Sequence, residues 1–240
     1  MHTHLGPLDF DVPRVDDGEL LGQLREPRTL VAIASAAIAI FGDSELGNAQ
    51  MALAAASGHV AGLHGYVVAD PTDLDSCTDQ LRRYLDAPGV LGVKVHGEWS
   101  RTPTASRAMT DLFDLLARYG RPVKIHNTGD GWDEALGAIA RRHPRLPIVV
   151  AHGGLGAPSI EGARLAASTD NVRLEFSSSF ANLATVREAV AIAGPERILW
   201  GSDAPLLEPA FVLGTYHDSG LAPDAIDRVF WSNATELYGL

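Results

Sequence analysis

The sequence predicts an α/β protein, a single-domain (β/α)8 TIM barrel, on the basis of three observations. Short apolar or β-branched runs, typical of buried parallel strands, recur along the whole chain. Amphipathic stretches with helix start and stop signals separate these runs. The runs begin roughly 25 to 32 residues apart, about the length of one βα unit, and eight such units fit a chain of 240 residues.

Eight strands and the helices between them are expected in a fixed order along the chain. The first strand contains His2 and His4, and the other seven cover residues 29–34, 62–68, 90–96, 122–126, 147–152, 172–177 and 197–203. Helices are expected at 104–119, before Gly120, and at 183–193, before Gly194. Residues 5–28, with a short helix near 17–24, and residues 205–220 depart from a minimal barrel.

A single domain spanning residues 1–240 is expected, because no Pro/Gly/Ser-rich linker and no charge block divides the chain. An open doubly wound sheet is the structural alternative, but its G-x-G-x-x-G phosphate fingerprint follows none of the runs. The first strand is the weakest element, since only Met1 precedes His2. That strand is therefore very short, or the native start lies upstream.

Composition and charge indicate a soluble globular protein and narrow its partners. Hydrophobic residues make up 46% of the chain and charged residues 20%. A formal charge of -11 repels phosphate backbones and anionic lipid, so neither nucleic acid nor a membrane is an expected partner. The single cysteine, Cys77, excludes an intrachain disulfide framework and indicates a reducing compartment. With no signal peptide visible and no apolar run of about 20 residues, a cytoplasmic protein is expected.

Metal-binding side chains collect where the predicted strands end. In a barrel these ends share one rim, and here they carry His2, His4, Lys94, His96, His126, His152, Ser177 and Asp203. Residues two apart on a strand share a face, so His2 and His4 can bind one ion. Neutral imidazole and carboxylate suit Zn, Mn or Fe, and three or four such ligands with an open position are typical of a catalytic metal site.

The chain resembles the amidohydrolase-related (amidohydrolase 2) branch of the amidohydrolase superfamily. The resemblance rests on HTH at 2–4, GVKVH at 92–96, GRPVKIH at 120–126, PIVVAHGG at 147–154, NVRLEFS at 171–177, RILWGSDAP at 197–205 and NA at 233–234. These motifs run nearly end to end in the right order, so they are specific for the superfamily. They do not specify a reaction, because this branch contains lactone and amide hydrolases, non-oxidative decarboxylases and hydratases.

The resemblance implies a set of metal ligands and assigns functional positions to His152 and Lys94. The implied ligands are His2, His4, His126 and Asp203. His152 is either a further ligand, as in two-metal members, or a catalytic acid, base or electrophile. Lys94 occupies the position of a carboxylated lysine that bridges two ions in two-metal relatives. We favour a lysine that pairs with a carboxylate inside the rim, and hence one metal per chain, most simply Zn²⁺; two ions are expected if Lys94 is carboxylated.

Loops after the predicted strands supply the candidate substrate-binding residues, because βα loops build the pocket of a barrel. These candidates are Lys94, His96, Trp99, Arg101 and Trp132. His96 either contacts substrate or caps its loop, and Arg101 is either the cation for an anionic substrate or a surface residue. One layer deeper, Lys124 and Glu175 can form an internal ion pair, since an unpaired buried charge is costly.

These features favour a metal-dependent hydrolase that acts on a small amide, imide or lactone through a metal-activated water. Asp203 would accept the water proton and His152 would polarise the carbonyl. One alternative is a non-oxidative decarboxylase of a small carboxylic acid; greater length in known members and the lack of an obvious substrate arginine argue against it. Another is a non-catalytic metal-binding barrel subunit. Phe211, Val212 and Leu213 are expected to be exposed apolar residues that suit a homodimer interface.

Overall fold

The strands form one parallel sheet whose order follows the chain. The computed structural model describes residues 3–6, 30–58, 62–127, 129–154, 160–178 and 181–240. Within them the sheet order is β1-β2-β3-β4-β5-β6-β7-β8, every neighbouring pair being parallel. The strands are β1 (Thr3–Leu5), β2 (Ala32–Ala36), β3 (Leu63–Ala69), β4 (Val90–His96), β5 (Val123–His126), β6 (Ile148–Val150), β7 (Val172–Glu175) and β8 (Ile198–Leu199).

Backbone contacts between β1 and the segment after β8 close the sheet. Thr3 forms a parallel bridge with Ala204, whose carbonyl accepts hydrogen bonds from the His4 N–H and the Thr3 hydroxyl, both at 2.8 Å. This closure confirms the predicted (β/α)8 TIM barrel. It also brings His4 beside Asp203, although about 200 residues of sequence separate them.

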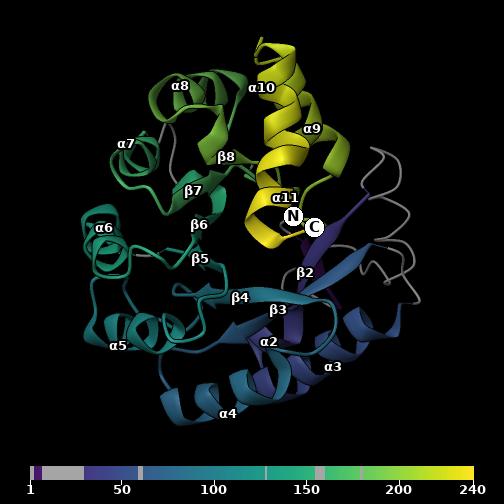
Figure 1. Cartoon of the computed structure of the whole chain (residues 1–240), viewed down its shortest axis with the longest axis vertical. Helices are drawn as coiled ribbons and strands as arrows, with labels where there is room; N and C mark the ends of the chain where they lie inside the picture. The colour runs from purple at the N-terminus through teal and green to yellow at the C-terminus, as the bar shows by residue number, and fades with distance from the viewer. Residues whose placement is uncertain (1–2, 7–29, 59–61, 128, 155–159, 179–180) are drawn as a thin grey trace.

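Helices surround the ring of strands, as Figure 1 shows. They are α2 (Ala37–Phe41), α3 (Ser44–Ser57), α4 (Leu74–Tyr84), α5 (Arg107–Leu116), α6 (Trp132–Arg142), α7 (Glu161–Ser168), α8 (Leu183–Ala193), α9 (Pro209–His217), α10 (Pro223–Asp227) and α11 (Asn233–Tyr238). The helix predicted at 183–193 is confirmed as α8, which Asn182 caps by accepting hydrogen bonds from the N–H groups of Ala184 and Thr185. The short helix expected near 17–24 lies outside the described residues.

Several predicted elements are shorter in the structure, and for two of them the local reason is clear. The helix expected from residue 104 begins at Arg107, because the Ser106 hydroxyl caps it by accepting from the Met109 N–H. The strand expected at 197–203 keeps only two residues as β8, since the Trp200 N–H instead donates to the Val229 carbonyl. Residues 201–203 are thereby released from the ladder and form part of the rim.

Alternation along β4 and β5 separates the helix-facing core from the barrel interior. Val93, Val95, Val123 and Ile125 are buried in the main hydrophobic core together with helix residues. The residues between them, including Lys94 and Lys124, point to the opposite face of the sheet and are buried inside the barrel. A separate apolar cluster also lies inside: Ile33, Tyr66, Val149, Leu199 and Tyr238.

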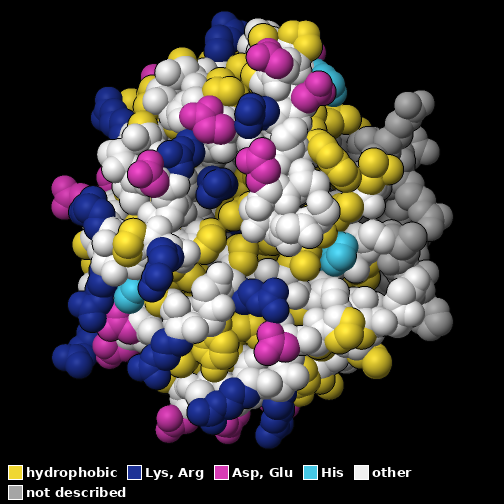
Figure 2. Space-filling view, in the orientation of Figure 1, with side chains coloured by type: hydrophobic (Ala, Val, Ile, Leu, Met, Phe, Trp, Pro, Cys, Tyr) yellow, Lys and Arg dark blue, Asp and Glu magenta, His cyan; other side chains and the backbone are white. Residues whose placement is uncertain are grey.

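One expectation about the surface is corrected. Phe211 is exposed on α9, but Val212 is buried in the main core and Leu213 packs against it, because helical spacing turns successive side chains to different faces. Figure 2 shows hydrophobic side chains gathered over α9, with acidic and basic side chains interspersed on the rest of the visible face. No helix in the described part of the chain has the length and apolar character needed to cross a bilayer. A dimer contact at α9 stays a prediction.

Candidate metal centre and active site

A cavity of about 480 Å³ opens at the carboxyl ends of the strands. Its lining comprises His4, Phe41, His96, Glu98, Trp99, Arg101, His126, His152, Asp203 and Leu206. The cavity is therefore lined both by imidazoles and carboxylates and by aromatic and aliphatic side chains. This is the end of the barrel at which such enzymes place their chemistry.

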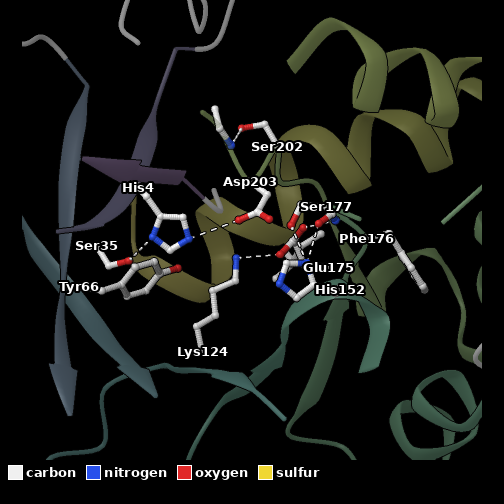
Figure 3. Close-up of polar contacts among 12 residues, drawn as sticks. His4, Ser35, Tyr66, Lys124, His152, Glu175, Phe176, Ser177, Ser202 and Asp203 are labelled. Atoms are coloured by element: carbon white, nitrogen blue, oxygen red, sulfur yellow. Dashed lines mark hydrogen bonds and ion pairs between the residues drawn. The ribbon is translucent and has the colours of Figure 1, made fainter. Parts of the chain in front are cut away.

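His4 and Asp203 form one of the polar contacts in the cavity. His4 Nε2 lies 3.3 Å from Asp203 Oδ1, and His4 Nδ1 lies 3.1 Å from the Ser35 hydroxyl (Figure 3). Burial lowers the pKa of His4, which favours the neutral imidazole. Burial opposes ionisation of Asp203, but the hydrogen bond from His4 and neighbouring positive charge outweigh it and lower the pKa of Asp203. A neutral imidazole and a carboxylate are the protonation states that bind a metal.

His126 and His96 come from paired positions on β5 and β4. Their rings stack with centroids 4.0 Å apart. His126 Nε2 lies 2.9 Å from Glu98 Oε2, and the Trp99 N–H donates to His96 Nδ1 at 3.3 Å. Burial, and then the nearby His96, lowers the pKa of His126. His96 thus lines the cavity and accepts a hydrogen bond from its own loop, while its contact with substrate stays a prediction.

His152 is held by an unusual backbone conformation and by the end of β7. It lies in the 3-10 turn Ala151–Gly154 with φ of 58°, a left-handed value that is uncommon outside glycine. A Cβ on the next residue, Gly153, would lie 2.1 Å from the Phe176 ring, so that position requires glycine. His152 Nδ1 donates to the Ser177 carbonyl at 2.6 Å, and its ring meets His126 edge-on with centroids 4.9 Å apart.

A layer of charged residues lies beneath these imidazoles. The predicted ion pair is confirmed, with Lys124 Nζ 2.9 Å from Glu175 Oε2 and both side chains 0% exposed. Lys94 is also buried, and burial, joined by the charge of Lys124, lowers its pKa to about 7. A lysine with this pKa is partly uncharged at neutral pH. Both the ammonium and the carboxylated form of Lys94 therefore stay open as predictions.

The other predicted substrate-binding residues divide between two places. His96, Trp99 and Arg101 line the cavity, whereas Trp132 lines a neighbouring depression of about 490 Å³ that shares Glu98 with it. Sequence reasoning missed Phe41 and Leu206 as lining residues and the contact of Glu98 with His126. Phe41 ends the short helix that follows β2, and its position after a strand was the signal that could have identified it.

The donor types fit a divalent ion, although the set is not assembled in the described residues. No three His, Cys, Asp or Glu side chains among those residues form a group that could hold a metal ion as they are arranged. His2 lies outside the described residues, and His126 directs Nε2 at Glu98. The chemistry nevertheless suits the ion, since neutral imidazole nitrogen and carboxylate oxygen meet at His4 and Asp203. The ligand set His2, His4, His126 and Asp203 therefore stays a prediction.

Solved structures with the same fold include aromatic-acid decarboxylases. A 2,6-dihydroxybenzoate decarboxylase from Rhizobium matches with a TM-score of 0.73 and 15% identity, covering 94% of this chain and 88% of that one. A 5-carboxyvanillate decarboxylase from Sphingomonas paucimobilis gives 0.72 and 16%, covering 95% and 84%. A dihydroxybenzoic acid decarboxylase from Polaromonas sp. JS666, with bound manganese and the inhibitor 2-nitroresorcinol, gives 0.70 and 16%, covering 94% and 86%. At this identity the likeness shows the fold alone.

Comparison at the level of sequence identifies the family. No curated protein matches the chain. A family model described as amidohydrolase, however, matches residues 2–240, which confirms the resemblance carried by the strand-end motifs. The chain belongs to the amidohydrolase family.

Proposed function

We propose that this protein is a metal-dependent decarboxylase of a small aromatic carboxylic acid. The observation that carries the proposal is the pairing, in one cavity, of an aromatic wall with the guanidinium-bearing residue Arg101. From the sequence alone a hydrolase was favoured, and a decarboxylase was the alternative. One argument against it was the lack of an obvious substrate arginine, but Arg101 lines the cavity. The other was length: two decarboxylases of this fold are longer than this chain, which still spans 84% to 88% of them.

The aromatic wall suits a flat ring. Phe41 and Trp99 pack edge to face with centroids 4.7 Å apart and an interplanar angle of 80°. Leu206 adds an aliphatic surface to the same cavity. Aromatic side chains arranged in this way favour further ring contacts at centroid separations of about 4.5–7 Å. A substrate ring against Phe41 and Trp99 would direct its substituents toward the imidazoles.

Arg101 suits a carboxylate. It forms no ion pair with any carboxylate among the residues that the structure describes, and its φ of 53° is unusual for a residue other than glycine. A guanidinium presents a planar fork of donors that matches carboxylate geometry. An anionic substrate would therefore find its counter-charge at the mouth of the cavity.

Decarboxylation requires a proton donor beside the ring. The bond between the ring carbon and the carboxylate breaks, its electron pair remains on that carbon, the carboxylate leaves as CO2, and one proton adds to the carbon. His152 is the proposed donor: with its Nδ1–H donated to the Ser177 carbonyl, the doubly protonated ring would give the proton on Nε2 to the ring carbon and regain one from water. Asp203, held as a carboxylate, would accept a proton from a substrate hydroxyl and orient His4.

A divalent ion is part of this proposal. Members of the amidohydrolase superfamily bind a divalent metal, and one decarboxylase of this fold holds manganese. In this chain His4, His126 and Asp203, with His2, would hold the ion. When bound, it would supply positive charge that stabilises negative charge on substrate oxygens.

Hydrolysis is the second candidate, favoured by the contact between His4 and Asp203. Asp203, whose carboxylate lies 3.3 Å from the buried His4 imidazole, would accept a proton from water, which is the role required for amide or lactone cleavage. That role is compatible with the same ligand set. The two candidates differ in the substrate that is consumed.

A substrate panel with metal analysis separates the candidates. Protein purified without added metal is analysed for its metal content, stripped with a chelator, and reloaded separately with Zn²⁺ and Mn²⁺. Each form is assayed with 2,6-dihydroxybenzoate, 5-carboxyvanillate and benzoate, and with small amides, imides and lactones. We expect metal-dependent CO2 release from a hydroxylated aromatic acid, abolished in His152→Gln. Turnover of an amide or lactone without any CO2 release would contradict the proposal.

A further inference from the structure

The buried ion pair Lys124–Glu175 costs free energy because both charges are removed from water, and the proposed reaction does not use it directly. Both side chains are 0% exposed, and neither lines the cavity. Barrel interiors of this class are usually filled by branched apolar residues, and apolar replacements of buried ion pairs are often at least as stable. A reason other than stability is therefore needed for the pair.

Glu175 uses its two carboxylate oxygens for two different partners. Oε2 contacts the Lys124 ammonium at 2.9 Å, and Oε1 accepts a short hydrogen bond from the Ser177 N–H. Gly201 packs against the same carboxyl group, and a Cβ there would lie 2.6 Å from the carboxyl carbon. The carboxylate is thus enclosed between Lys124, Gly201 and the backbone that leads to Ser177.

The backbone of residues 176 and 177 connects the fixed Glu175 carboxylate to His152. The Phe176 N–H donates to the Tyr216 hydroxyl at 3.2 Å, which fixes the intervening residue. The Ser177 carbonyl then accepts a hydrogen bond from His152 Nδ1 at 2.6 Å. A carbonyl can only accept, so the proton must lie on Nδ1. Figure 3 shows this path from Lys124 through Glu175 and Ser177 to His152.

We propose that Lys124 and Glu175 are positioning residues that fix the tautomer and orientation of the His152 ring through the backbone of Ser177. The catalytic consequence rests on the proposed function, in which Nε2 of His152 exchanges a proton with substrate. A ring whose Nδ1 always carries the proton presents the same nitrogen to the cavity in every turnover. The pair acts through His152 and touches no substrate.

The charge state of Glu175 agrees with this role. Burial opposes its ionisation, but the Lys124 charge, followed by His152 and the Ser177 N–H, outweighs burial and lowers the pKa of Glu175. The side chain is therefore a carboxylate, which accepts hydrogen bonds and cannot donate them. An apolar side chain of similar size would fill the space without orienting the Ser177 peptide.

The test separates positioning from stability by removing both charges together. Lys124→Met/Glu175→Leu keeps the interior filled and leaves no unpaired charge, so it is expected to fold. Glu175→Gln is the second variant, which keeps volume and one acceptor oxygen. Tyr238→Phe is the control, because it removes a buried hydrogen bond to Tyr66 elsewhere in the interior, away from His152. Zinc-loaded proteins labelled with 15N at histidine are compared by long-range 1H–15N spectra, with the His152 signals assigned by their loss in His152→Gln.

We expect the wild type and Tyr238→Phe to show the proton of His152 on Nδ1. In the double variant we expect a mixture of tautomers, with kcat on the substrate found by the panel about 10- to 100-fold lower and KM changed by less than about threefold. Glu175→Gln should lie between the two. The spectra report on His152 even if the panel finds no substrate, so failure of the proposed function is distinguishable from failure of this proposal.

Two results would overturn the proposal. One is a folded double variant in which the proton of His152 stays on Nδ1 as in the wild type, with kcat, on any substrate that the panel finds, within about twofold of wild type. The other is loss of folding in both variants, which would assign the pair a purely structural role.

Discussion

The interior of the barrel contains two regions of opposite character. The apolar inner cluster, comprising Ile33, Tyr66, Val149, Leu199 and Tyr238, includes one polar contact, a hydrogen bond of 2.6 Å between the two tyrosine hydroxyls. Val31 and Leu91, which pack against it, lie at the amino ends of β2 and β4. The polar inner cluster, comprising His4, Lys94, Lys124, His126, His152, Glu175 and Asp203, occupies the region toward the carboxyl ends of the strands.

The difference shows how one set of strands serves both stability and chemistry. On β4 and β5 every second residue faces inward, so the residue chosen at each level decides the character of that level. The apolar cluster satisfies its few polar atoms within itself. In the polar cluster, stability depends on paired charges, and function depends on where those pairs direct the imidazoles. Substitutions in the two regions should therefore have separable effects.

The largest effect is expected from Asp203→Asn in the polar inner cluster. The amide can still coordinate through oxygen, but it cannot accept a proton at neutral pH, so turnover should fall by roughly 10² to 10⁴ while metal content is largely kept. Steady-state rates and metal analysis on the same preparation check this. A variant that retains about a third of the wild-type rate would exclude the proton-transfer role of Asp203.

Next in size is the loss of stability in Lys124→Met. This change leaves the Glu175 carboxylate buried without its 2.9 Å partner, and breaking a buried pair in this way typically costs about 3–5 kcal/mol. Urea unfolding measures the change. The double variant Lys124→Met/Glu175→Leu should regain most of the free energy of unfolding that Lys124→Met loses. If both variants were equally destabilised, the unpaired Glu175 charge would not be the cause of the loss.

A smaller effect is expected from Arg101→Ala at the mouth of the cavity. Loss of a charged hydrogen bond to the substrate carboxylate should cost about 1.5–3 kcal/mol, seen as a raised KM for aromatic acids with thermal stability unchanged. Arg107→Ala is a matched control, because Arg107 is an exposed arginine on α5 that pairs with Asp111 outside the cavity. An unchanged KM in Arg101→Ala would show that Arg101 does not bind the substrate carboxylate.

The smallest effect is expected from Tyr238→Phe in the apolar inner cluster. It removes the hydrogen bond to Tyr66 and leaves that hydroxyl buried, so the free energy of unfolding should fall by about 1–3 kcal/mol. kcat and KM should match the wild type. A change in kcat comparable to that of the polar-cluster variants would show that the two regions are not separable.

The sequence was sufficient for the architecture because strand periodicity and strand-end residues are local signals. Apolar runs predicted seven of the strands, and the His-Thr-His segment at 2–4 predicted the first. The predicted pair of Lys124 and Glu175 followed from their expected inward faces. Strand length was less predictable. β8 is only two residues long because the backbone of Trp200 bonds to Val229, a contact that no local pattern encodes.

The site was predictable only in part, for the same reason. Strand-end positions identified His4, His126, His152 and Asp203, which all line one cavity. The sequence could not show that Glu98 reaches His126 or that the Ser177 carbonyl fixes His152, because these contacts join separate βα units. The helix residue Val212 was predicted to be exposed but is buried in the main core, because the register of α9 was unknown.

The most direct test of the central claim is decarboxylation in deuterated water. The metal-loaded protein is incubated with a 13C-carboxyl-labelled hydroxybenzoate in D2O, and the gas and the ring product are analysed by mass spectrometry and NMR. We expect 13CO2 and one deuterium on the ring carbon that carried the carboxylate, with both lost in His152→Gln. The proposed decarboxylase activity would be contradicted if every labelled hydroxybenzoate were recovered intact while the same protein hydrolysed a lactone or amide under the same conditions.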